Sequence, residues 1–157
     1  MQIKKKYQLE KPSNFDRIKN FFGFFVIYPF EQTLLDCLQD RLSVEEREIL
    51  CHQIGRFTVV RRLFRHLGIQ GAYGFTNFHT FRFGKNISGK LQKKTFANKD
   101  EEVLLATARV THAKGEINIQ FWIVRGIFFS IEYRSAQHQY HPLSSFDIVD
   151  IVVWPNK

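Results

Sequence analysis

The clearest pattern in the chain is a pair of apolar, alternating segments between residues 117 and 134, which read INIQFWIVRGIFFSIEYR. Residues with high strand propensity flank Arg125-Gly126, and glycine adopts the positive φ that a two-residue hairpin turn requires. We therefore predict a β-hairpin in which Val124 pairs with Ile127 and side chains alternate between the two faces outward from the turn.

This alternation assigns the hairpin side chains to two faces. The first face would carry Ile117, Ile119, Phe121, Ile123, Phe128, Ser130, Glu132 and Arg134, and the second Asn118, Gln120, Trp122, Val124, Ile127, Phe129, Ile131 and Tyr133. Residues 103–112 are expected to pair with this hairpin through a turn at Lys114-Gly115, with Val110 opposite Ile119. The second face is then polar at one end and aromatic at the other. Either a helix covers the aromatic end, or that end binds a partner.

Residues 13–68 carry the signals of helices. Ser13 or Asn14 can cap a helix that begins at Phe15, with four apolar residues (Phe15, Ile18, Phe21 and Phe22) on one side. Pro29 suits the first turn of a second helix over roughly 30–41. The capping-box sequence from Ser43 to Glu46 predicts a third helix that runs from Val44 to Leu67 and ends at Gly68. A strand between residues 44 and 67 would contradict this arrangement.

The remainder of the chain favours strands. Residues 73–83 and 146–154 predict further strands, while residues 1–12 form a basic arm that is either frayed or a short edge strand. The lysine-rich connection over 84–102 is long enough to be functional or mobile. Helices followed by antiparallel strands predict one α+β domain spanning 1–157. In it, the helical part (13–68) packs on one face of an antiparallel sheet of about four to five strands built from 69–157.

Composition narrows the class of partner. The 157 residues include 17 Phe and one Met, which predicts an aromatic-rich interior. The formal charge of +8 favours nucleic acid, an anionic membrane surface or an acidic protein as the partner.

Cys37 and Cys51 fall in predicted helices, so we interpret both as reduced and the location as cytoplasmic. The apolar run over 21–30 is too short to span a bilayer, and we expect no membrane insertion.

No motif in the sequence predicts catalysis, a metal site or a cofactor. Cys51 and His52 are neighbours on a predicted helix and point roughly 100° apart, so they do not form a nucleophile pair by themselves. His138 and His141 have no cysteine pair or acidic partner nearby in the sequence, as a metal site would require. Phosphate-binding glycine motifs are also absent from the sequence. We therefore expect a protein that is not an enzyme.

The basic charge keeps RNA binding open as an alternative function. The stretch Arg125-Gly-Ile-Phe-Phe129 resembles the start of the RNP1 motif of RNA-recognition-motif domains, but it departs from that motif at Phe128 and Glu132. A basic, aromatic-bearing surface can bind single-stranded RNA without that fold. The alternative is therefore a generic RNA-binding module.

Two segments together resemble a family of small uncharacterised bacterial proteins, some of which are immunity partners of toxin systems. The segments are Gln53-Ile-x-Arg-Phe-x-x-Val-x-Arg62 and Trp122-Ile-Val-Arg-Gly-Ile-Phe-Phe-Ser-Ile-Glu-Tyr133. The resemblance implies a one-domain, non-enzymatic binding protein, most specifically an immunity-type inhibitor that neutralises a bacterial toxin domain by direct binding. It implies no residue roles. From charge and aromatic character, we expect contacts to an acidic surface of the partner from Arg61, Arg62, Arg65, Lys85, Lys90, Lys93, Lys94, Trp122 and Tyr133.

Overall fold

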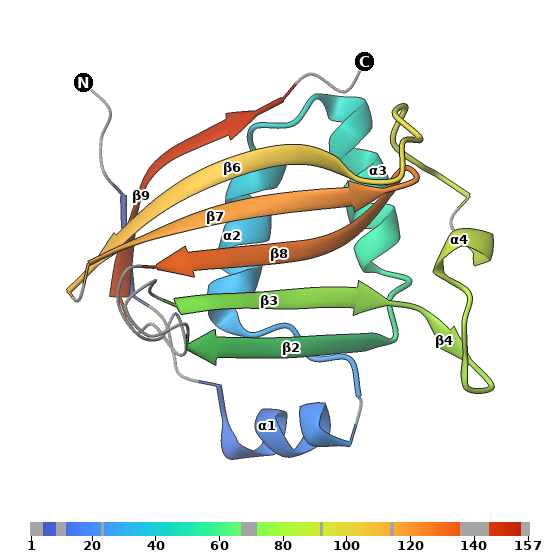
Figure 1. The fold of residues 1–157 in the computed structure, drawn as a ribbon, viewed down its shortest axis with the longest axis horizontal. Helices are drawn as coiled ribbons and strands as arrows, with labels where there is room; N and C mark the ends of the chain where they lie inside the picture. The colour runs from blue at the N-terminus through green and yellow to red at the C-terminus, as the bar shows by residue number, and fades with distance from the viewer. Residues whose placement is uncertain are drawn as a thin grey trace.

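The protein has an α+β fold in which a curled antiparallel sheet carries helices on one face (Figure 1). The computed structural model describes residues 5–8, 12–22, 24–66, 72–91, 93–113, 115–135 and 145–154. Its elements are β1 (Lys5–Gln8), α1 (Asn14–Phe21), α2 (Pro29–Gln39), α3 (Val44–Ile54), β2 (Val59–His66), β3 (Ala72–His79), β4 (Phe81–Arg82), β5 (Lys85–Asn86), α4 (Ser88–Leu91), β6 (Val103–His112), β7 (Gly115–Val124), β8 (Ile127–Ser135) and β9 (Ser145–Val153).

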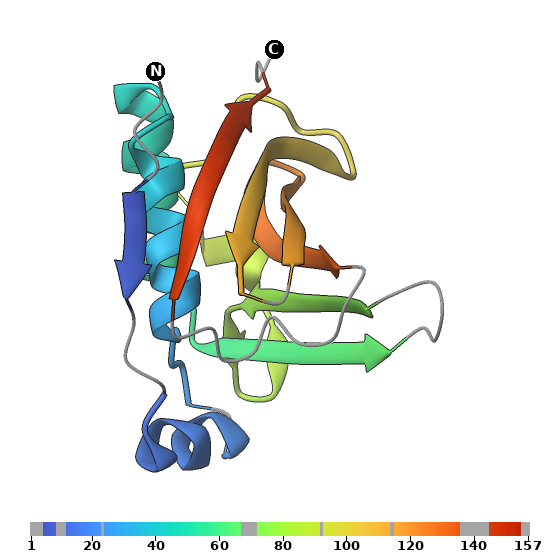
Figure 2. The ribbon, with the colours of Figure 1, turned by 90° about the vertical axis from the view of Figure 1, so that its left-hand side faces the viewer.

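The described residues form a larger sheet than the sequence suggested. Its seven strands lie in the order β1-β9-β6-β7-β8-β3-β2, and β4 and β5 form a separate two-stranded hairpin. The α+β class is therefore confirmed, but the expected four to five strands were too few. Of the two alternatives for the N-terminal arm, residues 5–8 adopt the edge strand, which pairs with β9. Figure 2 shows α2 and α3 together on one side of the sheet.

Two of the helices begin where the capping signals predicted. The Ser13 side chain accepts a hydrogen bond from the Asp16 N–H at 3.0 Å, and the Ser43 side chain accepts one from the Glu46 N–H at 3.2 Å. Each acidic side chain accepts in return from the serine backbone, which completes a capping box. Pro29 opens α2, where its missing N–H costs nothing.

The third helix is much shorter than predicted. It ends at Ile54 with Gly55 as its C-cap, and residues 59–66 form β2, an edge strand that pairs with β3. The predicted helix to Leu67 is therefore wrong beyond Ile54, and the helical part does not extend to residue 68. The sequence did not reveal this strand, because its core-facing positions include both an apolar residue, Val60, and a charged one, Arg62.

The predicted hairpin turn is confirmed. Val124 pairs with Ile127 across Arg125 and Gly126, whose φ angles are 51° and 78°. Two successive positive φ angles match the twist of a two-residue hairpin. In the neighbouring pair of strands, Val110 lies opposite Ile117 rather than the predicted Ile119. This two-residue shift leaves the side chains from Ala106 to Thr111 on their predicted faces, because the strand period is two.

A β-bulge reverses the faces of β8 beyond the turn. Trp122 pairs with Ser130 while the next residue toward the turn, Ile123, pairs with Phe128, so Phe129 is the extra residue. The reversal moves Ile131 and Tyr133 into the core and Glu132 and Arg134 to the other face. The predicted faces of these four residues are therefore wrong. The sequence gives no signal for the bulge. The extra residue, Phe129, follows another phenylalanine, Phe128, so the apolar pattern does not show which of the two faces the core.

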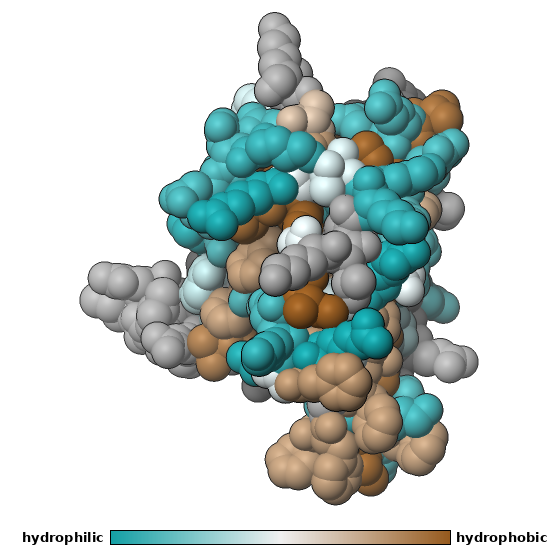
Figure 3. All heavy atoms as spheres, turned by 90° about the vertical axis from the view of Figure 1, so that its right-hand side faces the viewer, coloured by the Kyte–Doolittle hydropathy of each residue, from teal (hydrophilic) through white to brown (hydrophobic). Residues whose placement is uncertain are grey.

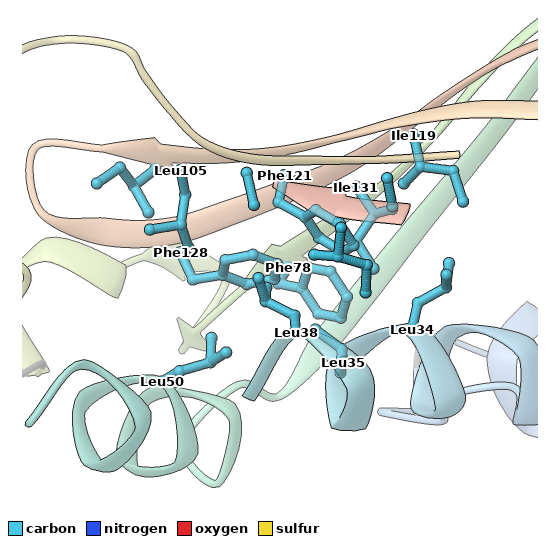
Figure 4. Packing of buried hydrophobic residues seen from close by; sticks show 14 of the residues in the cluster. Leu34, Leu35, Leu38, Leu50, Phe78, Leu105, Ile119, Phe121, Phe128 and Ile131 are labelled. Carbon is cyan, nitrogen blue, oxygen red and sulfur yellow. The ribbon is translucent and has the colours of Figure 1, made fainter. Parts of the chain in front are cut away.

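The core lies between the helices and one face of the sheet. Figure 4 shows leucines of α2 and α3 pointing at aromatic and aliphatic side chains of the strands. The residues in contact include Leu34, Leu35, Leu38 and Leu50 from the helices and Phe78, Phe121, Phe128 and Ile131 from the sheet, each at most 1% exposed. Each such side chain contributes about 1.5–3 kcal/mol when it is fully buried.

The lysine-rich segment over 84–102 is anchored to this core. Phe96 is fully buried, and its N–H donates to the Gly126 carbonyl at 2.9 Å. The buried Gln53 side chain of α3 donates to the carbonyls of Lys94 and Gly126 at 2.9 and 3.0 Å, and it accepts from the Phe128 N–H at 2.7 Å. One amide side chain therefore holds the helix, this segment and the hairpin turn together.

We predict that Gly126→Ala destabilises the protein more than Gly84→Ala does. Both glycines have positive φ, at 78° and 74°, so each alanine costs roughly 1–2 kcal/mol in left-handed strain. A Cβ at position 126 would also lie 2.9 Å from the Phe96 carbonyl oxygen, whereas nothing lies within 4 Å of one at position 84. We expect roughly 1–3 kcal/mol of additional loss at 126, measured by urea unfolding. Equal losses would contradict this account of the turn.

Candidate functional site

The sheet face turned away from α2 and α3 is the first candidate for a binding site. It faces the viewer in Figure 1, and we call it the outer face. Its described residues include Arg61, Leu63, Tyr73, Phe75, Thr107, Arg109, Asn118, Gln120, Trp122, Glu132, Arg134, Asp150 and Val152. The arginines are exposed, and the aromatic side chains are half-buried. This mixture differs from the apolar inner face, where the same strands supply the core.

A cavity of about 290 Å³ opens on the outer face over β6, β7, β8 and β9. It is lined by six polar or charged residues and three apolar ones, which are Thr107, Arg109, Asn118, Gln120, Arg134 and Asp150 with Ala108, Ile119 and Val152. Guanidinium, carboxylate and amide groups in one hollow can both donate and accept hydrogen bonds to a partner's side chains or backbone.

Two buried polar atoms near this cavity have no hydrogen-bond partner within the described ranges. They are the Gln120 Oε1 and the Trp122 Nε1, from successive outer-face positions of β7. A buried polar atom that lacks a partner costs roughly 1–3 kcal/mol. Neither atom is open to solvent, so a bound molecule would reach it only after the side chain changes its rotamer.

Tyr73 connects the cavity to the aromatic part of the outer face. It pairs with Arg134 across the β3–β8 ladder, and the Arg134 guanidinium lies 5.9 Å from the centroid of its ring. Burial raises the pKa of Tyr73, and the neighbouring Glu132 carboxylate raises it further. The hydroxyl therefore keeps its proton at neutral pH and can act as a hydrogen-bond donor.

At the far end of β3, aromatic rings surround His79. Its ring packs edge-to-face on Phe81 and Phe129, with centroids 5.8 and 5.6 Å apart. The Arg61 guanidinium lies 5.3 Å from the Phe81 centroid. Burial lowers the pKa of His79, and the positive charge of Arg61 lowers it further. The imidazole is therefore neutral at pH 7.

Three of the expected contact residues occupy strand positions in register with the outer face. Arg61 and Trp122 lie there directly. The register places Arg65 opposite Tyr73, although the Arg65 side chain lies outside the described part.

The expected lysines lie elsewhere. Lys85 and Lys93 are exposed in the β4–β5 hairpin and the following loop. Lys94 forms an ion pair with Glu48 of α3 at 3.1 Å, and the Lys90 side chain is outside the described part. The structure therefore does not gather the expected basic residues on one surface.

Tyr133 is not an exposed contact residue, contrary to expectation. Its side chain is 1% exposed and faces the core because of the bulge at Phe129. The hydroxyl lies 3.2 Å from the Thr76 Oγ1, within hydrogen-bond distance.

Arg62 is also buried, and it acts as a structural connector. Its side chain is 8% exposed and forms a two-pronged ion pair with Glu31 of α2, through Nε to Oε1 at 2.6 Å and Nη2 to Oε2 at 2.5 Å. It also donates to the Asn20 Oδ1 and the Val26 carbonyl, each at 2.6 Å. Arg62 therefore joins β2 to α1, to α2 and to the segment between them.

The Glu31 carboxylate is fully supplied with donors. Thr76 donates to its Oε1 at 2.8 Å, and the Tyr28 N–H donates to its Oε2 at 2.9 Å. Burial alone would lower the pKa of Arg62, but the hydrogen bonds and charge of Glu31 raise it above its ordinary value. The guanidinium is therefore a cation, and both buried charges are matched inside the protein.

The other groups singled out by chemistry do not converge. Cys37 and Cys51 are not joined in a disulfide. The Tyr7 hydroxyl lies 3.1 Å from the Cys37 Sγ, and the Cys51 Sγ donates to the Gln39 Oε1 at 3.2 Å. Among the described residues, no three His, Cys, Asp or Glu side chains are placed to hold a metal ion. His138 and His141 lie outside the described residues. Within the same residues, no helix has the length and apolar character to cross a bilayer.

We predict that Arg62→Met destabilises the protein by roughly 3–5 kcal/mol, because it leaves the buried Glu31 charge without its partner. The matched control is Arg61→Met, the adjacent exposed residue of the same strand, for which we expect a change within about 0.5 kcal/mol. Urea unfolding at neutral pH measures both. Similar losses for the two variants would show that the ion pair does not hold the structure together.

We predict that protonation of His79 at acidic pH lowers the stability of the folded protein. Its folded-state pKa is below the ordinary value of 6.5, so the unfolded chain binds the proton more readily. Its contribution to the free energy of unfolding is fully present above pH 6.5 and is lost as the pH falls below that value. His79→Gln should therefore reduce the loss of unfolding free energy between about pH 7 and pH 5. An unchanged pH profile would contradict this assignment.

Comparison of the chain with protein-family models, with curated proteins and with solved structures finds no match in any of the three. The likeness to small bacterial immunity proteins accordingly stays a prediction. The geometry of the outer face is the basis on which a function can be argued.

Proposed function

We propose that the chain is a non-enzymatic, protein-binding protein that holds its partner on the outer face of the sheet. The supporting observation is the cavity over β6 to β9, where guanidinium, carboxylate and amide side chains line one hollow on the same sheet face as Trp122. Arginine, tryptophan and tyrosine contribute most of the binding free energy at protein interfaces, and all three occur on this face.

The charges on the outer face favour a protein over RNA. Arg109 lies opposite Asp150 in the β6–β9 ladder, and Glu132 is the neighbour of Arg134 two positions along β8. Carboxylates placed between arginines repel phosphate groups, whose contacts dominate nucleic-acid affinity. A folded protein can present a matching mixture of both signs. RNA binding is therefore the alternative that the experiment below must exclude.

The sequence resemblance supplies the class of partner within this proposal. It suggests an immunity-type inhibitor that neutralises a bacterial toxin domain by direct binding, in the cytoplasm. A net charge of +8 would accelerate association with a toxin that carries an acidic surface. Affinity would then depend on the cavity and on the Trp122 and Tyr73 side chains, since screened surface charges add little by themselves.

The test is affinity capture with the tagged chain from cells that naturally express it, washed at low and at high salt, with and without ribonuclease. The double variant Arg109→Glu/Arg134→Glu reverses two charges on the outer face. Its matched control, Arg41→Glu/Arg56→Glu, reverses two exposed charges in the turns that follow α2 and α3. We expect one stoichiometric protein with the wild type and the control, and roughly a tenfold or larger loss of affinity with the outer-face variant.

Two results would contradict the proposal. Recovery of RNA that is lost on ribonuclease treatment or at high salt would favour the nucleic-acid alternative. Equal retention of the same protein by both double variants would show that the partner binds outside the outer face.

A further inference from the structure

Helix α1 presents its apolar side to solvent instead of to the protein. With 3.6 residues per turn, Phe15, Ile18, Phe21 and Phe22 lie within an arc of roughly 120°. These side chains are 64%, 53%, 84% and 71% exposed, and none of the residues of α1 is buried. A surface helix normally packs such a stripe on the core. The following Phe24 is also 63% exposed.

The outward orientation is fixed by the polar side of the helix. Asn20, on the opposite side, accepts a hydrogen bond from the buried Arg62 at 2.6 Å. Asp16 shares that side and is half-buried, while the apolar stripe is exposed. The same network that joins β2 to α2 therefore holds α1 with its phenylalanines pointing away from the protein.

A second element adds an exposed phenylalanine at the same end of the molecule. Phe83, at the tip of the β4–β5 hairpin, is 93% exposed. Figures 1 and 2 both place this tip and α1 beyond β2, the edge strand of the sheet. Figure 3 shows apolar side chains gathered at this end, where α1 lies. We call Phe15, Ile18, Phe21, Phe22, Phe24 and Phe83 the apolar end.

Basic groups lie beside the apolar end. The Lys19 ammonium is 4.3 Å from the Phe15 ring centroid, and the Arg82 guanidinium is 5.5 Å from that of Phe83. Arg17 and Lys85 on the same two elements are exposed. The carboxylate of these two elements, Asp16, is engaged in the N-terminal cap, where it accepts from the Ser13 hydroxyl at 2.7 Å. The exposed charge of this end is therefore positive.

We propose that the apolar end docks the protein on the surface of an anionic lipid bilayer. The phenylalanine rings would lie at the boundary between headgroups and acyl chains, and the Arg and Lys side chains would reach the anionic headgroups. The apolar side chains protrude from two separate elements. A fluid bilayer can surround each of them, whereas a folded partner would need a separate hollow for each. A second copy would bring like charges together, which disfavours self-association.

This docking is independent of the proposed partner site, because it leaves the outer face free. It also requires no segment to cross the bilayer. The interaction is a shallow, reversible one, in which salt weakens the electrostatic part.

The test is co-sedimentation of the full chain with vesicles of phosphatidylcholine, with and without phosphatidylserine, at low and high salt. Phe21→Ser/Phe22→Ser and Phe83→Ser each remove exposed rings of the apolar end. The matched control is Val44→Ser, which removes a 73% exposed apolar side chain at the start of α3. Figure 1 shows this residue's helix beginning at the opposite end of the molecule from α1. Urea unfolding of each variant checks that its stability is unchanged.

We expect binding only to vesicles that contain phosphatidylserine, and weaker binding at high salt. The partition coefficient should fall by roughly tenfold or more in the Phe21/Phe22 variant and by a smaller factor in the Phe83 variant, with no change for Val44→Ser. Absence of binding to the anionic vesicles would overturn the proposal. So would binding that is unaffected by the phenylalanine substitutions, or a dimer in solution that these substitutions dissociate without any vesicle binding.

Discussion

The ion pair between Glu31 and Arg62 is the constraint on which the rest of the arrangement depends. Removing both charges from water costs several kcal/mol per ion, so they are tolerated only when every donor and acceptor is matched. Here the matching groups come from α1, the segment after it, α2, β2 and β3. Moving any of these elements away would leave a buried charged group short of a hydrogen-bond partner. The pair therefore determines where the edge strand lies and which way the first helix faces.

The two faces of the sheet differ in composition, and one bulge in β8 makes this difference possible. Without the extra residue at Phe129, β8 would place Glu132 and Arg134 against the leucines of α2 and α3. With it, the strand contributes Ile131 and Tyr133 to the core and both charged side chains to the outer face. Arg134 lines the cavity on that face. The candidate site therefore depends on the bulge that places this side chain there. The apolar side of α1 is separate from this site, and its outward orientation follows from the hydrogen bond between Asn20 and Arg62.

Features that depend on neighbouring residues were predicted correctly from the sequence, whereas features that depend on contacts between distant residues were not. The caps at Ser13 and Ser43 and the turn at Arg125-Gly126 depend on neighbouring residues, so residue type and spacing suffice to predict them. The strand β2 was mistaken for a helix because Arg62 interrupts its alternation, and the partner that allows it to be buried is Glu31, far away in the chain. Charge and aromatic character placed Arg61 and Trp122 among the expected contacts, and both lie on the outer face. Arg134 could not be assigned to it, since its face depends on the bulge.

The pairing of β1 with β9 has a consequence for how the chain folds during synthesis. Lys5 pairs with Ile148, so the first strand of the sheet has no neighbour until the last one leaves the ribosome. The helices emerge early, but β6, β7 and β8, which supply much of the surface that covers their leucines, are made in the second half of the chain. Closing such long loops has an entropic cost that precedes any gain from the contacts, which slows folding. The nascent N-terminal half must therefore keep apolar helices in water until β6, β7 and β8 are complete, and this is the period when a chaperone would have most to protect.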